Sequence, residues 1–244
     1  MVVIKTKTYE EIILKELIMW QIKMVKKPSL SNRLTKGVQN RVNNIVPDKV
    51  HEVITGTIKN MVKAVLFGSG FITKKPLVGV SLEDREKLVK ESIAFYKRTA
   101  AISGAGTGYG GILLGLADLP VLLSLKIKFL FNVASLYGFN VSDYKERIYI
   151  LYIFQLAFSS QEKRNKVYKQ ISDWENKKQE LPKDMNLFQW KEFQQEYRDY
   201  IDIAKMLQLV PIIGAPIGAF ANYRLLDNLG KTAMNAYRLR LIKS

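Results

Sequence analysis

The residue types that most enzymes use for nucleophilic or metal chemistry are scarce in this sequence. The chain has one histidine, His51, and no cysteine. A metal centre or a Ser/His/Asp arrangement needs several partners close together, so we predict no catalytic residue, no metal site and no cofactor. Because His51 lies beside apolar residues at helical spacing, we interpret it as a structural residue.

A GxGxxG pattern occupies Gly106, Gly108 and Gly111. In a dinucleotide-binding fold this pattern follows a strand, begins a helix and precedes an acidic residue by about 20 positions. Here the preceding residues are typical of a helix, and Phe131 stands where the acidic residue is required. The sequence also lacks a GxxxxGK[ST] loop. We therefore reject a nucleotide-binding site.

The most apolar and glycine-dense stretch runs from Thr99 to Leu125, and a second glycine-bearing apolar stretch lies near the C-terminus. In both, glycines recur at steps of three or four residues, which places them on one helical face and lets another helix approach closely. We predict that the two segments pack against each other through Gly104, Gly108, Gly111, Gly115, Gly214 and Gly218. Two interpretations of the first stretch remain open, a bilayer-spanning segment or a buried helical hairpin in a soluble core.

Asp118 is the first charged residue after this uncharged run. One interpretation is that it caps a helix whose first turn contains Pro120, because aspartate accepts hydrogen bonds from free N–H groups there. The other is a buried carboxylate paired with an arginine, since a charge in apolar surroundings is costly unless paired. Arg224 and Arg98 are the candidate partners.

Basic residues outnumber acidic ones by 38 to 22, which gives a net charge of +16. Such a charge indicates an anionic partner. The basic residues are spread along the chain without a nucleic-acid-binding motif, and they flank the apolar stretches, so a membrane surface is favoured over nucleic acid. We predict anionic-lipid contacts at Lys97, Arg98, Lys126 and Lys128. Acidic residues precede the first apolar run, so we expect no secretory signal. The expected location is the cytoplasmic side of the cell membrane, or the cytoplasm with peripheral membrane association.

Helical periodicity explains most of the chain, and no run of alternating β-branched residues predicts a strand. The Ser81 and Asp84 pair is typical of a capping box, and Trp174 is expected to hold the charged region 161–183 to the body. We predict an all-α fold, a single multi-helix domain, with an amphipathic helix in residues 1–28 and the remaining domain in residues 29–244. The first helix is open to two interpretations, a membrane-surface or partner-docking helix and an ordinary core-packing helix. The expected helices are Tyr9 to Lys27, Pro47 to Phe67, Ser81 to Arg98, Pro120 to Tyr137, Ser142 to Ser159 and Asp184 to Leu207.

The central block resembles the signature of the EcsC family, and it reads GAGTGYGGILLGLADLPVLLSLKIKFLFNVASLYGFN. Three other stretches are similar to bacterial members of that family, namely IVPDKVHEVITGTIKNMVKAVLFGS, KERIYILYIFQLA and GAPIGAFANYRLLDNLGKTAMNAYRLR. Members often carry arginine in the helix after ADLP, where this chain has Lys126 and Lys128. This difference keeps the charge but removes bidentate hydrogen bonding.

The resemblance implies an intracellular protein associated with the Ecs ABC transporter, whose other components are an ATPase and a multispanning membrane protein. That system is linked to protein and peptide secretion and to membrane proteolysis in low-GC Gram-positive bacteria. The resemblance implies no enzymatic activity, so the leading hypothesis is a non-enzymatic accessory protein at the membrane. The alternatives are a carboxylate-based hydrolase or lipid-modifying enzyme on a helical bundle, and a nucleic-acid-binding protein.

Overall fold

Helices make up nearly all of the regular structure in the part of the chain that the computed structural model describes, which is residues 8–26, 48–67, 75–106, 116–202, 206 and 215–243. These residues hold nine α-helices and one short 3₁₀-helix, and their β-structure is limited to one isolated bridge between Ser159 and Ile201. The prediction of a single all-α domain is therefore confirmed.

The helices have the following bounds: α1 (Tyr9–Val25), α3 (Asp48–Phe67), α4 (Leu82–Gly106), α6 (Leu119–Leu136), α7 (Tyr144–Phe158), α8 (Gln161–Ser172), α9 (Trp174–Glu180), the 3₁₀-helix η1 (Met185–Leu187), α10 (Trp190–Tyr200) and α12 (Ala215–Lys243).

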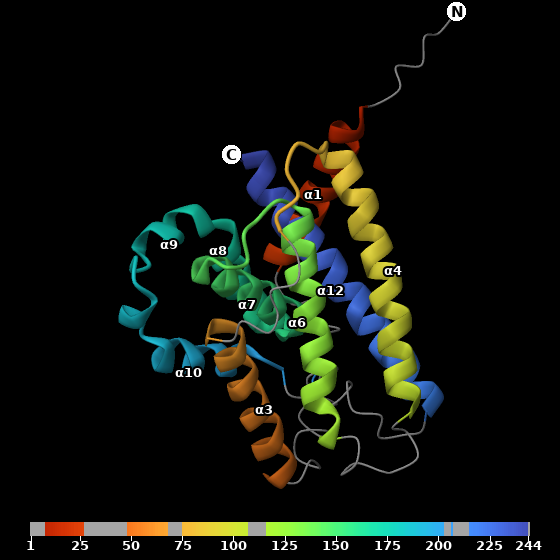
Figure 1. Ribbon diagram of the computed structural model, residues 1–244, viewed down its shortest axis with the longest axis vertical. Helices are drawn as coiled ribbons and strands as arrows, with labels where there is room; N and C mark the ends of the chain where they lie inside the picture. Colours follow the sequence, from red (N-terminus) through yellow and green to blue (C-terminus); the bar gives the residue numbers. More distant parts are fainter. Residues whose placement is uncertain are drawn as a thin grey trace, which may run out of the picture.

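Three long helices, α4, α6 and α12, run along the length of the molecule (Figure 1). α4 and α12 run in opposite directions and form the most extensive helix pair, and α6 packs against both. α7 lies beside α12, α6, α3 and α8, and its side chains are buried almost all round, as expected of a helix without a polar face. α1 packs on α8 and α12, while α3 packs on α6, α7 and α10.

Local signals in the sequence set several helix ends. Thr8 and Glu11 form a capping box at the start of α1, and the hydroxyl of Ser81 accepts a hydrogen bond from the N–H of Asp84 at 3.2 Å. The Ser81 hydroxyl also donates to the Asp84 carboxylate at 2.7 Å, so this pair fixes the start of α4 as expected. α4 continues past the predicted end at Arg98 to Gly106, because alanine and serine do not stop a helix.

The predicted helix from Asp184 to Leu207 is wrong in its extent. η1 and α10 take its place, and the chain turns after Tyr200 so that Ile201 can pair with Ser159. The N–H of Asp202 then donates to the carbonyl of Phe158 at 3.0 Å. Hydrogen bonds to the end of α7 therefore replace those of a continuing helix. Trp174, by contrast, is 1% exposed and anchors the charged region as predicted.

α6 is the one helix in the described part of the chain whose length and composition would allow it to cross a membrane. Within the protein, 67% of that helix is buried against its neighbours, which is also typical of a core helix. The predicted apolar segment from Thr99 to Leu125 includes residues 107–115, which lie outside the described residues. Whether that segment enters lipid therefore stays a prediction.

The glycine-faced packing also stays a prediction. Gly108, Gly111, Gly115 and Gly214 lie outside the described residues. α4 and α12, which carry Gly104 and Gly218, do pack against each other, but the surroundings of these two glycines are not among the described features. The division of the chain at residue 28 likewise falls in the range 27–47, outside the described residues.

Candidate functional site

Lys126 does not contact the solvent. Its side chain is 0% exposed, and its Nζ atom donates a hydrogen bond to Asn222 Oδ1 at 3.1 Å across the interface between α6 and α12. Burial lowers the pKa of Lys126 to about 7 because the charged form is poorly solvated there. The prediction that Lys126 contacts anionic lipid is therefore wrong for this structure, since the apolar pattern of α6 turns this lysine inward.

Lys97 is also engaged within the protein. Its Nζ atom forms an ion pair with Asp227 at 2.5 Å and lies 4.2 Å from the ring centre of Tyr223, so it joins α4 to α12. Asp227 accepts a second ion pair from Lys231 at 2.7 Å. Arg98 and Lys128, in contrast, are exposed, and contact of these two side chains with anionic lipid stays a prediction.

Asp118 occupies the N-cap position of α6, but its side chain makes no capping hydrogen bond. Its backbone carbonyl accepts from the N–H of Leu122 at 3.0 Å. The ion pairs among the described side chains do not include one between Asp118 and either Arg98 or Arg224. Arg224 is exposed and lies 5.5 Å from the ring centre of Phe220.

α1 carries apolar side chains on two faces. Ile13, Leu17 and Met24 are buried against the body of the protein. The opposite face exposes six further apolar side chains by 43% to 59%, and these are Ile12, Leu14, Ile18, Met19, Ile22 and Val25. We call these six residues the outer face of α1.

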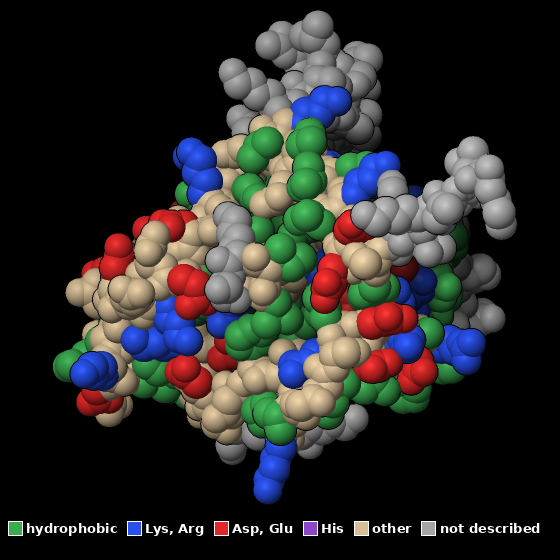
Figure 2. All heavy atoms as spheres, turned by 90° about the horizontal axis from the view of Figure 1, so that it is seen from above, with side chains coloured by type: hydrophobic (Ala, Val, Ile, Leu, Met, Phe, Trp, Pro, Cys, Tyr) green, Lys and Arg blue, Asp and Glu red, His purple; other side chains and the backbone are tan. Residues whose placement is uncertain are grey.

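Charged side chains of both signs surround the outer face. Lys15 and Lys23 of α1 and its C-cap residue Lys26 are exposed, and so are Glu10, Glu11 and Glu16. Figure 2 shows that hydrophobic side chains gather on one end of the molecule, with lysine and arginine side chains on both sides of them. Exposed apolar side chains in such a row, next to cations, are typical of a surface that contacts a membrane or another protein.

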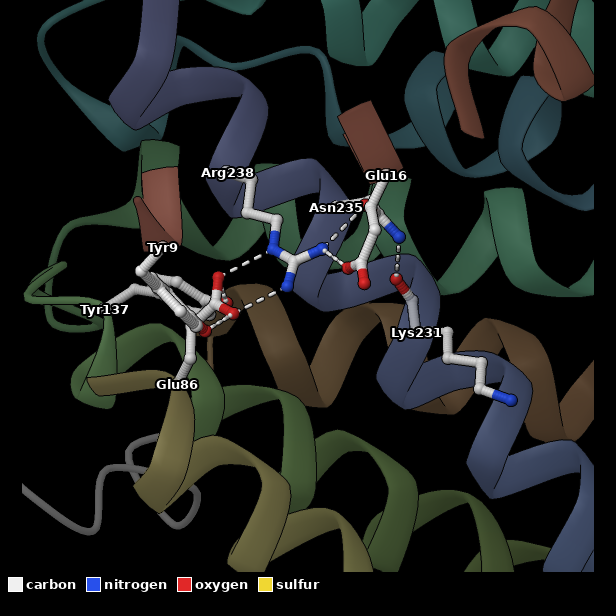
Figure 3. A network of polar contacts seen from close by, with 7 residues as sticks. All are labelled: Tyr9, Glu16, Glu86, Tyr137, Lys231, Asn235 and Arg238. Atoms are coloured by element: carbon white, nitrogen blue, oxygen red, sulfur yellow. Dashed lines mark hydrogen bonds and ion pairs between the residues drawn. The ribbon is translucent and has the colours of Figure 1, made fainter. Parts of the chain in front are cut away.

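A buried ion pair joins α12 to α4 (Figure 3). Arg238 donates from Nε and Nη2 to the two carboxylate oxygens of Glu86, each at 2.6 Å, and the two residues are 3% and 0% exposed. The hydroxyl groups of Tyr9 and Tyr137 donate to the same carboxylate at 2.5 and 3.3 Å. Burial alone would raise the pKa of Glu86, but the hydrogen bonds from Arg238 and Tyr9 outweigh it and hold that pKa below its usual value.

The same arginine also fixes α1. Arg238 Nη1 forms an ion pair with Glu16 at 2.9 Å, and Glu16 remains half exposed. Together with the hydrogen bond from Tyr9, this ties the start and the middle of α1 to the buried network. α1 is further held by an edge-to-face contact between Trp20 and Tyr168 of α8, with ring centres 5.6 Å apart.

A second ion pair lies two residues further along α12. Arg240 Nη1 contacts the buried Glu146 at 2.8 Å, and its Nε contacts the exposed Glu175 at 3.2 Å. The hydroxyl of Tyr237 donates to Glu146 at 2.8 Å, and the guanidinium carbon of Arg240 lies 3.9 Å from the ring centre of Phe139. Burial raises the pKa of Glu146, and Arg240 offsets only part of that rise.

These two networks were not predicted from the sequence. The sequence offers one signal for them, which is that Arg238 and Arg240 stand two residues apart near the end of the last helical pattern. Arginines with this spacing face nearly opposite sides of a helix, so each can bind a different partner. Each buried glutamate is bound by its own arginine and tyrosine, which is the arrangement of a structural ion pair rather than an acid and base facing a substrate. The described residues contain no group of three or more His, Cys, Asp or Glu side chains that could hold a metal ion.

A cavity of about 560 Å³ lies beneath α1, between this helix and α4, α7, α8 and α12. Its wall combines apolar side chains, among them Trp20, Met24 and Ile93, with charged ones. The basic residues in the wall are Lys23, Lys90, Arg164, Lys231 and Arg238, and the acidic ones are Glu16 and Asp227. This volume is within the range of small-molecule sites, about 300 to 1,000 Å³.

The fold and these sites define a basic, all-helical protein whose C-terminal helix is fixed by buried arginines. The sequence model of the EcsC protein family matches residues 11–242, so the chain belongs to the EcsC family, as its resemblance predicted. It is 44% identical over 237 residues to Protein EcsC of Bacillus subtilis (strain 168), covering 97% of this chain and 98% of that protein. It is 30% identical over 143 residues to the uncharacterized protein YdbA of the same strain, covering 59% of this chain and 53% of YdbA. No solved structure matches the chain.

Proposed function

We propose that this protein is a non-enzymatic accessory protein that docks on the cytoplasmic face of the cell membrane, with α1 lying in the lipid interface. The outer face of α1 is the observation that carries the proposal. Its six apolar side chains are about half exposed although the helix already has a buried apolar face, so they are not needed for the core described above.

The free energy available from this face is sufficient for reversible membrane binding. Burying an apolar side chain of this size fully contributes about 1.5 to 3 kcal/mol, so six half-exposed ones would contribute on the order of 5 kcal/mol. Lys15, Lys23 and the C-cap residue Lys26 are matched in number by the exposed Glu10, Glu11 and Glu16, so the apolar face supplies most of the binding free energy of this helix. The net charge of +16 would strengthen attraction at longer range.

We further propose that the membrane site is close to an Ecs-type ABC transporter and that the protein acts in protein or peptide secretion. Membership of the EcsC family and 44% identity to Protein EcsC over 97% of the chain support this assignment. The transporter's ATPase and membrane subunit are the proposed partners.

Fractionation of cells that express the tagged protein tests the membrane role. We expect the wild-type protein in the membrane pellet, released by alkaline carbonate. In the double variant Ile18→Glu/Ile22→Glu we expect most of the protein in the soluble fraction, because a carboxylate in the lipid interface is costly. The matched control is Val78→Glu/Leu187→Glu, which adds the same charge at exposed apolar side chains outside α1 and should leave the protein in the pellet.

A wild-type protein found wholly in the soluble fraction would contradict the membrane role. Membrane binding that resists carbonate and requires detergent for release would instead assign the attachment to an embedded segment, such as the stretch from Thr99 to Leu125. Equal amounts of the α1 variant and its control in the pellet would exclude α1 as the docking helix. Far-UV circular dichroism verifies that both variants are folded.

A further inference from the structure

The cavity beneath α1 holds more positive charge than its own acidic residues neutralise. Glu16 is paired with Arg238 at 2.9 Å, and Asp227 is paired with both Lys97 and Lys231. Arg238 is in addition bound to Glu86 at 2.6 Å. The three remaining basic residues in the wall, Lys23, Lys90 and Arg164, form no ion pair with any described residue.

Arg164 is the most unusual of the three. It lies in the first half of α8, is only partly exposed, and its guanidinium makes no described hydrogen bond. Burial lowers the pKa of Arg164, and no carboxylate among the described side chains offsets that effect. A guanidinium removed from water without a counterion costs free energy, so this position favours an anion that the described part of the chain does not supply.

The rest of the wall is suited to an aliphatic chain. Trp20 and Met24 of α1, Ile93 of α4, Leu156 of α7 and Met234 of α12 line the cavity. A ligand with one anionic end and one apolar end would satisfy both parts of the wall.

We propose that this cavity binds a phosphate-headed amphiphile, with the phosphate at Arg164, Lys23 and Lys90 and the aliphatic chain along the apolar wall. A phosphate monoester carries more than one negative charge at neutral pH and presents several acceptor oxygens, which matches three cations better than a single carboxylate does. A guanidinium also binds phosphate through two parallel hydrogen bonds. The proposal goes beyond membrane docking and does not depend on it, because a monomeric ligand in solution would occupy the same cavity.

Isothermal titration calorimetry of the full chain with decanoyl lysophosphatidic acid, below its critical micelle concentration and without vesicles, tests the proposal. We expect saturable binding at one site. In Arg164→Gln the affinity should fall tenfold or more, because the charge-assisted hydrogen bonds are lost. Arg198→Gln removes the same charge at an exposed position outside the cavity and should bind as tightly as the wild type.

Two further probes measure how much the phosphate and the aliphatic chain each contribute to the affinity. Inorganic phosphate and monodecanoylglycerol should each bind at least tenfold more weakly than the lysophospholipid. Inorganic phosphate binding as tightly as the lysophospholipid would overturn the assignment of an amphiphile. An Arg164→Gln affinity equal to that of the wild type, or the absence of saturable binding, would overturn the site itself.

A second pair of variants keeps the test decisive if Arg164→Gln does not fold. Lys23→Gln/Lys90→Gln leaves Arg164 in place and should weaken binding tenfold or more, while the exposed pair Lys63→Gln/Lys183→Gln, outside the cavity, should not. Equal affinities of these two double variants would also contradict the proposal. The variant Ile18→Glu/Ile22→Glu should bind the lysophospholipid as tightly as the wild type does. The proposal of membrane docking and the proposal of a cavity site can therefore be contradicted separately.

Discussion

At the scale of single residues, the buried amine of Lys126 makes the free energy of unfolding depend on pH. The pKa of this amine is about 7 in the folded protein, against 10.5 for a free lysine. Between these values the unfolded chain binds a proton that the folded chain does not, so this residue makes stability rise with pH from about 7 to 10.5. Below pH 7 the cost of burying the charge is constant, on the order of 5 kcal/mol.

The substitution Lys126→Met should therefore stabilise the protein at pH 7 and lose that advantage at high pH. Removing the buried amine avoids the cost of its charge, and the lost hydrogen bond to Asn222 costs about 1 kcal/mol, so we expect a net gain of roughly 3 kcal/mol at pH 7. Urea denaturation at pH 7 and pH 10 measures it, with exposed Lys128→Met as the control. A gain that is the same at both pH values would show that the lysine is not buried in the neutral form.

Gly138 provides a second residue-scale prediction. Its φ of +91° is a conformation that other residues rarely adopt, and an added Cβ would lie 3.0 Å from the carbonyl oxygen of Leu77. Gly138→Ala should therefore destabilise the protein by about 1 to 3 kcal/mol. Gly56 in α3 has open space around it, so Gly56→Ala should stabilise by up to about 1 kcal/mol. Thermal denaturation of the two variants should give shifts of opposite sign.

At the scale of elements, Arg238 joins three helices. Its guanidinium binds Glu86 of α4 and Glu16 of α1 from its own position on α12. Removing one member of a buried pair leaves an uncompensated charge, whereas replacing both by apolar residues is often nearly neutral. The exposed Glu16 contributes less because water screens its charge.

A double-mutant cycle measures this coupling. Arg238→Met should destabilise the protein by about 3 to 5 kcal/mol, because Glu86 is then buried without a counterion. The double variant Glu86→Leu/Arg238→Met should recover much of that loss. Exposed Glu83→Gln, three residues before Glu86, serves as the control and should change stability by less than about 0.5 kcal/mol. Additive effects of the two single changes in urea denaturation would contradict the coupling.

At the scale of the whole molecule, α1 connects the two proposals. Its inner face forms part of the cavity wall, with Trp20 and Met24, and its outer face is the proposed lipid contact. A ligand in the cavity would lie between this helix and the α4/α12 pair. The net charge of +16 would attract both an anionic lipid surface and an anionic ligand.

The sequence by itself determined the class of fold and most helix positions. Periodic apolar residues predict α3, α6 and α7 closely. Local signals such as Ser81 at the start of α4 and Gly138 after α6 act over a few residues, so they can be recognised without knowing the fold. The order of motifs along the chain also predicted the family.

Only the tertiary structure decided which charged side chains are buried and what they contact. Lys126 and Lys128 are two residues apart in one basic, apolar run, yet one is buried against Asn222 and the other is exposed, because the packing of α6 on α12 selects the face. Glu86 and Glu16, the partners of Arg238, lie 152 and 222 residues away along the chain. No local sequence pattern can predict contacts over such separations. The cavity exists because five helices meet without filling the space between them, which is a property of packing and not of any one helix.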